Sequence, residues 1–314
     1  MAAGVSSGPV EAAQFRRSRA DVRGGAFRAL LILSVLASIT ILGALIYEMI
    51  AEGGSVLTTR LGAFLSTGLK SNPAVAGVWQ GIRGTVTLGC IVAVVAFPLG
   101  IGAAVYLEEY AGESRFARIV NVNIRNLAGV PSIVYGLLGL AIFVKLLGDG
   151  GTGGLTGGRT VISGGLTLAV LVLPIVIITT QEALRAVPDS LREGAYALGA
   201  TRWEVVRRSV LPAAAPGILT GTVLALARAT GEAAPLLVVG AVTGVFFTGG
   251  QTLLEQITQG RFTALPMVIF AWARLPAGQG WGALVGAASV VLLLIVIAMN
   301  AVAIVLRNRF ERRW

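Results

Sequence analysis

The sequence has no histidine, a single cysteine and few charged residues for its length. The absence of histidine from all 314 residues excludes a Ser-His-Asp triad, a histidine-ligated zinc site and a histidine general base. The single cysteine, Cys90, cannot form a disulfide within the chain and offers no metal-ligand spacing. We therefore expect no catalytic residue, no metal site and no cofactor.

Charged residues make up 13% of the chain, whereas a soluble domain normally has about a quarter of its residues charged. Because 55% of the residues are hydrophobic, lipid is expected to cover much of the surface. The 42 glycines fit this interpretation, since helices inside a bilayer rely on small residues for close packing. The net charge of +10 does not predict nucleic-acid binding, because the basic residues lie in short blocks between apolar runs.

A helix needs about 20 mostly apolar residues to cross the hydrocarbon core of a membrane. Six runs of roughly that length occur, at residues 27–50, 85–107, 127–144, 161–180, 217–241 and 283–306. The first run exceeds the roughly 7 to 15 apolar residues of a signal peptide, so it is predicted to be a retained span. The sequence thus predicts an all-α, polytopic membrane protein with six transmembrane helices.

Lysine and arginine are concentrated in alternate connecting segments, including both ends of the chain. Positive residues near the ends of spans stay in the cytoplasm, so both termini are predicted to be cytoplasmic. The expected organisation is a cytoplasmic tail (1–26), a first transmembrane helix (27–50), an extracytoplasmic segment (51–84), a core containing five further transmembrane helices (85–306) and a cytoplasmic tail (307–314).

The polar segment 181–212, between the fourth and fifth runs, has a strong local pattern. Its first half predicts a short helix that Asp189 or Ser190 can cap. Gly199 is suited to the left-handed residue that ends a helix. The segment is therefore expected to leave the membrane as a helix followed by a sharp turn.

The second half of this segment predicts another short helix. Thr201 followed by Glu204 is a capping-box pattern, and Trp203 lies on the apolar side of the predicted helix. We expect Pro212 to stop this helix. The two helices would form a compact knob that projects from the membrane.

The residues Glu193-Gly194-Ala195, Gly199 and Leu211-Pro212 resemble the EAA loop of ABC importer permeases, although Gly194 and Ser209 depart from the usual pattern. The resemblance implies that segment 181–212 couples the membrane helices to a separate ATPase subunit. The residues implied in this coupling are Glu193, Ala195, Gly199, Trp203, Leu211 and Pro212. The alternative is an ordinary amphipathic loop lying on the membrane, but such a helix would need a longer apolar face.

Arg228 lies near the centre of the fifth run, and Glu232 follows it at the helical spacing of four residues. A charged residue at the bilayer centre costs about 2.5 to 3.5 kcal/mol, so such residues generally face a pathway or a partner. Arginine suits a phosphate-like oxyanion, because its planar group donates two parallel hydrogen bonds. An entering anion could replace Glu232 as the partner of Arg228; the alternative is an internal salt bridge that only holds helices together.

Three stretches, at residues 98–112, 129–144 and 227–238, resemble one branch of these permeases, the phosphate importer permeases of the PstA type. The resemblance implies the MetI-like fold of type I ABC importers in a bacterial inner membrane. It also links an arginine and a glutamate at the positions of Arg228 and Glu232 to phosphate passage. The neighbouring hydroxyls of Ser132, Tyr135 and Thr230 are expected to bond within the helices instead.

The resemblance further implies three kinds of protein partner: a second permease subunit, a cytoplasmic ATPase dimer and an extracytoplasmic phosphate-binding protein. Residues 153–160 nearly match a phosphate-binding P-loop, but they follow a membrane span and not a β-strand, so the ATPase is expected to be another chain. Three alternatives remain open: the sister permease of a phosphate system, a sulfate or molybdate permease, and a proton-coupled secondary transporter using Arg228 and Glu232.

Overall fold

The computed structural model describes residues 22–112, 114–149, 154–241, 261–276 and 279–310. Every regular element in those ranges is helical, which confirms the all-α prediction. The chain divides into two compact units, Met1–Glu48 and Met49–Trp314, and the boundary falls within helix α1 (Val22–Thr59). Two short helices, α2 (Leu61–Ser66) and α12 (Leu265–Trp272), belong to the second unit.

The described part of the first unit is the leading portion of α1. Its long apolar side chains, among them Leu33, Ile39 and Leu42, are more than half exposed. A helix that is apolar on all sides requires lipid or protein around it. The helix also continues to Thr59, well beyond the predicted end at residue 50, because the sequence places no helix-breaking proline there.

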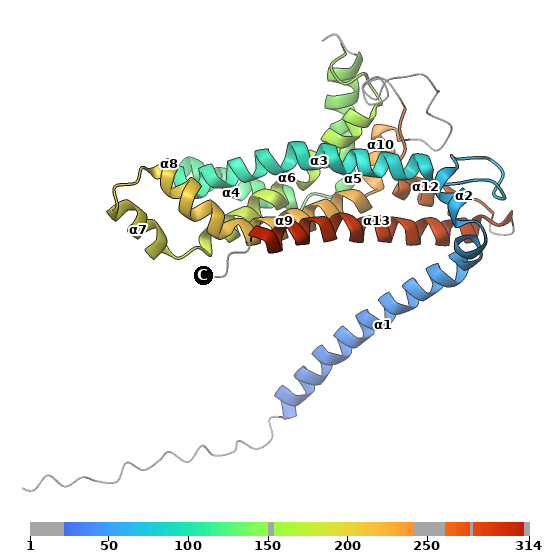
Figure 1. The fold of residues 1–314 in the computed structure, drawn as a ribbon, viewed down its shortest axis with the longest axis horizontal. Coiled ribbons are helices and arrows are strands. Elements are labelled where there is room, and N and C mark those ends of the chain that lie inside the picture. The colour runs from blue at the N-terminus through green and yellow to red at the C-terminus, as the bar shows by residue number, and fades with distance from the viewer. Residues whose placement is uncertain (1–21, 113, 150–153, 242–260, 277–278, 311–314) are drawn as a thin grey trace, which may run out of the picture. The chain divides into compact units, whose positions relative to one another are not determined.

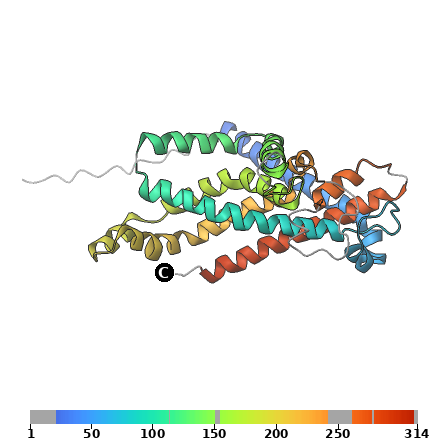
Figure 2. The same cartoon turned by 90° about the horizontal axis from the view of Figure 1, so that it is seen from above.

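Four long helices of the second unit lie side by side in both views (Figures 1 and 2). They are α3 (Trp79–Val105), α6 (Val161–Arg185), α9 (Leu211–Gly231) and α13 (Trp281–Phe310). Among the described residues, five helices are long and apolar enough to cross a membrane, or six if one bent pair forms a single span. The prediction of a polytopic membrane protein is confirmed.

Glycine allows α6 and α9 to approach closely. A Cβ atom added to Gly217 would lie 2.7 Å from the Cβ of Ala183. One added to Gly221 would clash with the hydroxyl of Thr179. Gly217 and Gly221 are four residues apart and so share one face of α9, which is the small-residue spacing of packed membrane helices.

The third predicted span is not straight. Helix α4 (Arg115–Ala128) is followed by helix α5 (Ser132–Gly139) and the π-helical segment η2 (Leu140–Asp149), and the chain turns by 104° between α4 and α5. Pro131 causes the break, because it lacks an N–H group and restricts the backbone of the residue before it. The continuous helical stretch in the predicted span over residues 127–144 therefore begins only at Ser132, after the break.

The fifth predicted span, at residues 217–241, is also interrupted. Helix α9 ends at Gly231, Glu232 has an extended backbone (φ −82°, ψ 116°), and helix α10 (Ala234–Val239) follows. Pro235 cannot donate a hydrogen bond into α9, and its ring would clash with the carbonyl of Gly231. Glu232 consequently lies at the end of a helix and not within one.

Candidate functional site

The segment between α6 and α9 forms two short helices with a glycine turn, as predicted. Helix α7 (Asp189–Ala197) precedes Gly199, whose φ of 78° is left-handed, and helix α8 (Arg202–Val205) follows. Both hydrogen bonds of the capping box are present: the hydroxyl of Thr201 accepts from the N–H of Glu204, and the carboxylate of Glu204 accepts from the N–H of Thr201. We call residues 186–201 the knob, and the end of the bundle that carries it the knob end.

Two details of the knob differ from the sequence predictions. Neither Asp189 nor Ser190 caps α7, because Pro188 occupies the cap position and Asp189 pairs instead with the guanidinium of Arg192, 3.0 Å away. Pro212 does not stop the second helix. The π-helical segment η3 (Val206–Val210) lies just before it, and the wider π turn accommodates a residue without an N–H group. A single helix therefore runs from Arg202 to Gly231.

The knob and α8 expose large apolar side chains to the surroundings. Leu198 is 90% exposed, and Trp203 is 55% exposed. No residue of α7 is buried. Of the predicted coupling residues, Glu193, Gly199, Trp203 and Pro212 are exposed, and Ala195 and Leu211 are partly buried. The exposed apolar side chains form a surface suited to burial against another protein.

Arg192 fixes the knob to the end of α3, a contact that the sequence reasoning missed. Arg192 donates to Glu109 over 2.9 Å and also to the backbone carbonyls of Leu184 and Val187. The pKa of Arg192 is raised: burial opposes its charge, but Glu109 and Asp189 more than offset that effect. Because Glu109 lies 83 residues away in the chain, no local spacing could have revealed this pair.

A second ion pair connects the end of α6 to the end of α3. Arg185, at the end of α6, donates two hydrogen bonds to the carboxylate of Glu108, from Nε over 2.9 Å and from a terminal nitrogen over 2.5 Å. Glu108 and Glu109 both belong to the π-helical segment η1 (Tyr106–Tyr110), which continues α3. The knob is therefore held to α3 and α6 at its base.

The structure brings Arg228 and Glu232 together at the end of α9. Their closest atoms, Nε of Arg228 and Oε1 of Glu232, are 3.6 Å apart, an ion pair that is too long for a strong hydrogen bond. The Arg228 side chain is 44% exposed, and the Glu232 side chain is 23% exposed. Arg228 is thus paired but accessible on the outer surface of this single chain.

Two of the three neighbouring hydroxyl groups, those of Tyr135 and Thr230, are engaged as predicted. Thr230 donates to the carbonyl of Leu226 over 2.9 Å, and Tyr135 donates to the carbonyl of Leu127 over 2.8 Å. Tyr135 also lies near enough to Arg228 to feel its charge. These contacts leave the two charged groups as the main polar features of the site.

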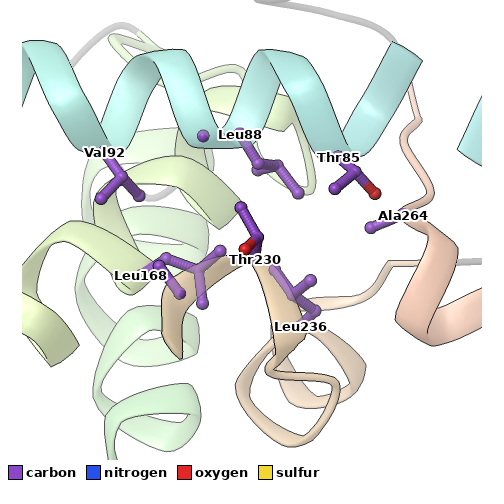
Figure 3. Close-up of a pocket in the computed structure, with 9 residues that line it drawn as sticks. Thr85, Leu88, Val92, Leu168, Thr230, Leu236 and Ala264 are labelled. Carbon is purple, nitrogen blue, oxygen red and sulfur yellow. The ribbon is translucent and has the colours of Figure 1, made fainter. Parts of the chain in front are cut away.

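Behind α9 lies a small internal cavity of about 10 Å³ (Figure 3). Thr85, Leu168 and Thr230 are among the residues that line it. A cavity of this size holds roughly one water molecule. It is too small for an oxyanion and is not lined by Arg228, whose side chain is 44% exposed.

The structure also reveals basic residues that the sequence reasoning placed in a cytoplasmic segment. Arg118 and Arg125 lie on α4, and both side chains are exposed. Helix α4 runs along the bundle beside α6 (Figures 1 and 2). Asn121 of α4 contacts Gln181 of α6, and Arg125 lies about one helical turn further along α4 from the knob end.

Comparison with known proteins defines the class of protein to which this fold and this site belong. The sequence pattern of binding-protein-dependent transport system inner membrane components matches residues 96–314, and the chain belongs to this family. It is the membrane permease component of an ABC importer.

Two individual relatives and one solved structure show what the chain is similar to within this family. The chain is 34% identical to the phosphate transport system permease protein PstA 1 of Mycobacterium tuberculosis, over 86% of this chain and 83% of the relative. It is 35% identical to the phosphate transport system permease protein PstA of Mycobacterium leprae, over 78% of this chain and 75% of that protein. A chain of a bacterial alginate ABC transporter has a similar fold, with a TM-score of 0.66, 14% identity and coverage of 92% of this chain and 96% of that one.

Proposed function

We propose that this chain forms part of the transmembrane pathway for inorganic phosphate in an ATP-driven importer. The observation that carries the proposal is the exposed Arg228, held near Glu232 where α9 is interrupted. A planar guanidinium suits a tetrahedral oxyanion, because it can donate two parallel hydrogen bonds. The relatives named as phosphate transport permeases support phosphate as the oxyanion.

In the proposed mechanism, phosphate replaces Glu232 as the partner of Arg228. The 3.6 Å separation leaves the guanidinium donors only weakly engaged by the carboxylate. An anion with better geometry can therefore take them over. When the anion leaves, Glu232 restores near neutrality at the site and opposes rebinding.

The knob is proposed to couple this site to a separate ATPase. The exposed apolar surface of the knob and α8, around Leu198 and Trp203, is suited to a groove in a partner protein. The helix from Arg202 to Gly231 joins the knob directly to Arg228. Closure of an ATPase dimer would then move the element that carries the arginine.

The remaining partner proteins and the orientation of the chain in the membrane follow from the same proposal. A second permease chain would close the pathway, because the exposed Arg228 is not enclosed by the part of this chain that the structure describes. An extracytoplasmic phosphate-binding protein would deliver the substrate. The knob end and both termini would lie in the cytoplasm, in agreement with the distribution of lysine and arginine.

Labelled-phosphate uptake in a strain lacking its own transporter tests this function. The wild-type chain, expressed with its partner subunits, is expected to restore uptake, and Arg228→Ala is expected to abolish it while assembly with the ATPase survives. Arg207→Ala, which removes an exposed arginine from η3, is the matched control. Normal uptake by Arg228→Ala would reject the role of this residue. Uptake that continues after ATP depletion would favour a proton-coupled transporter.

A further inference from the structure

Helix α4 is fixed beside α6 by a partly buried polar contact and an apolar one. The amide of Gln181 donates to the side-chain oxygen of Asn121 over 2.7 Å. Ile124 and Ile177 belong to the same buried cluster. Asn121 therefore lies level with Gln181, four residues from the end of α6 at Arg185.

The outward surface of α4 has two different flanks. Arg118 and Arg125 are seven residues apart, so they project in nearly the same direction. Phe116 and Ile119 point to the other flank and are 66% and 62% exposed. Among the described residues, neither Arg118 nor Arg125 has a carboxylate within ion-pair distance.

The contacts with α6 also give the order of the arginines along the bundle. Arg125 lies four residues beyond Asn121, or about 6 Å further from the knob end. Gly221 of α9 faces Thr179, and Arg228 lies seven residues beyond it. Arg228 is therefore about 7 Å deeper than Arg125, and Arg118 is about 10 Å shallower than Arg125.

We propose that Arg125, assisted by Arg118, is a second binding station for the oxyanion between Arg228 and the knob end. This inference rests on the proposed function of Arg228. The proposal places Arg125 inside the bilayer, where a charged group normally faces a pathway or a partner, and no described carboxylate pairs with it. Conduction needs several weak sites in series, so that an ion which binds can also leave. Tyr135 contacts both regions: its hydroxyl donates to the carbonyl of Leu127 at the end of α4, and its side chain lies near Arg228.

The sharpest test is water accessibility, for which the single cysteine makes the chain well suited. In a Cys90→Ala background, Arg125→Cys and Ile119→Cys are assembled with the partner subunits in inside-out vesicles. A negatively charged, membrane-impermeant thiol reagent is expected to label Arg125→Cys, and phosphate is expected to slow that labelling. Ile119→Cys, on the apolar flank and nearer the knob end, is expected to remain unlabelled. Absence of labelling at Arg125→Cys, equal labelling of both variants, or labelling that phosphate leaves unchanged would overturn the proposal.

Uptake measurements separate this proposal from the function on which it rests. Arg125→Gln is expected to lower phosphate uptake about tenfold, the order produced by losing one charge-assisted hydrogen bond, and Arg125→Lys is expected to retain most of it. Arg115→Gln, the same charge change at the start of α4, is the matched control. Normal uptake by Arg125→Gln together with loss in Arg228→Ala would reject the second station alone. Normal uptake by both variants would reject the proposed phosphate site as well, and uptake of sulfate instead of phosphate would change only the substrate.

Discussion

Glu232 is as important to the proposed exchange as the arginine, because it lets the bound anion leave. Glu232→Gln removes the competing negative charge and leaves Arg228 with an uncompensated positive charge. Phosphate should then bind more tightly but be released more slowly. Steady-state uptake is expected to show a lower KM and a lower maximal rate, and Glu232→Asp is the conservative control. An unchanged KM would show that the carboxylate does not compete for Arg228.

The ion pairs at the base of the knob differ in burial, which predicts different energetic effects. Arg192 and Glu109 have side chains that are 19% and 9% exposed, so Arg192→Ala leaves a carboxylate almost buried without its partner. We expect a loss of about 3 kcal/mol in stability. Arg185 is 51% exposed, and Arg185→Ala is expected to lose less than about 1 kcal/mol. Thermal unfolding of the purified assembly measures the stability loss in both variants. Equal losses would contradict the predicted effect of burial on these ion pairs.

At the level of helices, local sequence signals predicted local structure well. The capping box at Thr201 and Glu204 and the left-handed Gly199 are both present, because each depends on residues a few positions apart. The effects of two prolines were predicted less well, because Pro212 was expected to stop a helix and no break was predicted at Pro131. Pro131 bends a predicted span, whereas Pro212 leaves a helix intact, since a π-helical segment precedes it. That difference depends on backbone geometry that the residue types alone do not specify.

Gly199 should be sensitive to substitution, because its φ of 78° strains any residue with a Cβ atom. Gly199→Val is expected to distort the angle between α7 and α8 and to reduce ATP-driven uptake strongly. Gly199→Asn should be milder, since asparagine tolerates the left-handed conformation. Binding of the ATPase to the purified permease and phosphate uptake measure the effect, and equal behaviour of the two variants would argue against a requirement for this turn.

The close approach of α6 and α9 gives another prediction at this scale. In Gly221→Ala, the new Cβ would overlap the side chain of Thr179, so the helices must separate. A loss of about 1 to 3 kcal/mol is expected from this overpacking. Gly102→Ala is the matched control, because nothing lies within 4 Å of its added Cβ, and it should be neutral or slightly stabilising. Thermal unfolding compares the two.

For the molecule as a whole, the sequence predicted the class and the helical content but not the shape of the pathway. The third and fifth spans were expected to be straight, and both are interrupted near the arginines of the proposed pathway. The position of Arg125 was missed because the boundary of the third span was placed after it. The contact between Asn121 and Gln181, which fixes α4 inside the bundle, joins residues 60 positions apart and gives no local signal.

The break at Glu232 places the two charges of the site on different mechanical parts. Arg228 belongs to the continuous helix that begins at Arg202, beside the knob. Glu232 adjoins α10, which is held against α5 where Gly136 lies so close to Pro235 that an added Cβ would be 2.8 Å from its Cα. Movement of the knob along the axis would therefore change the distance between the charges without rebuilding either helix. Under the proposed coupling to an ATPase, such a displacement would change how strongly Glu232 competes with the anion for Arg228.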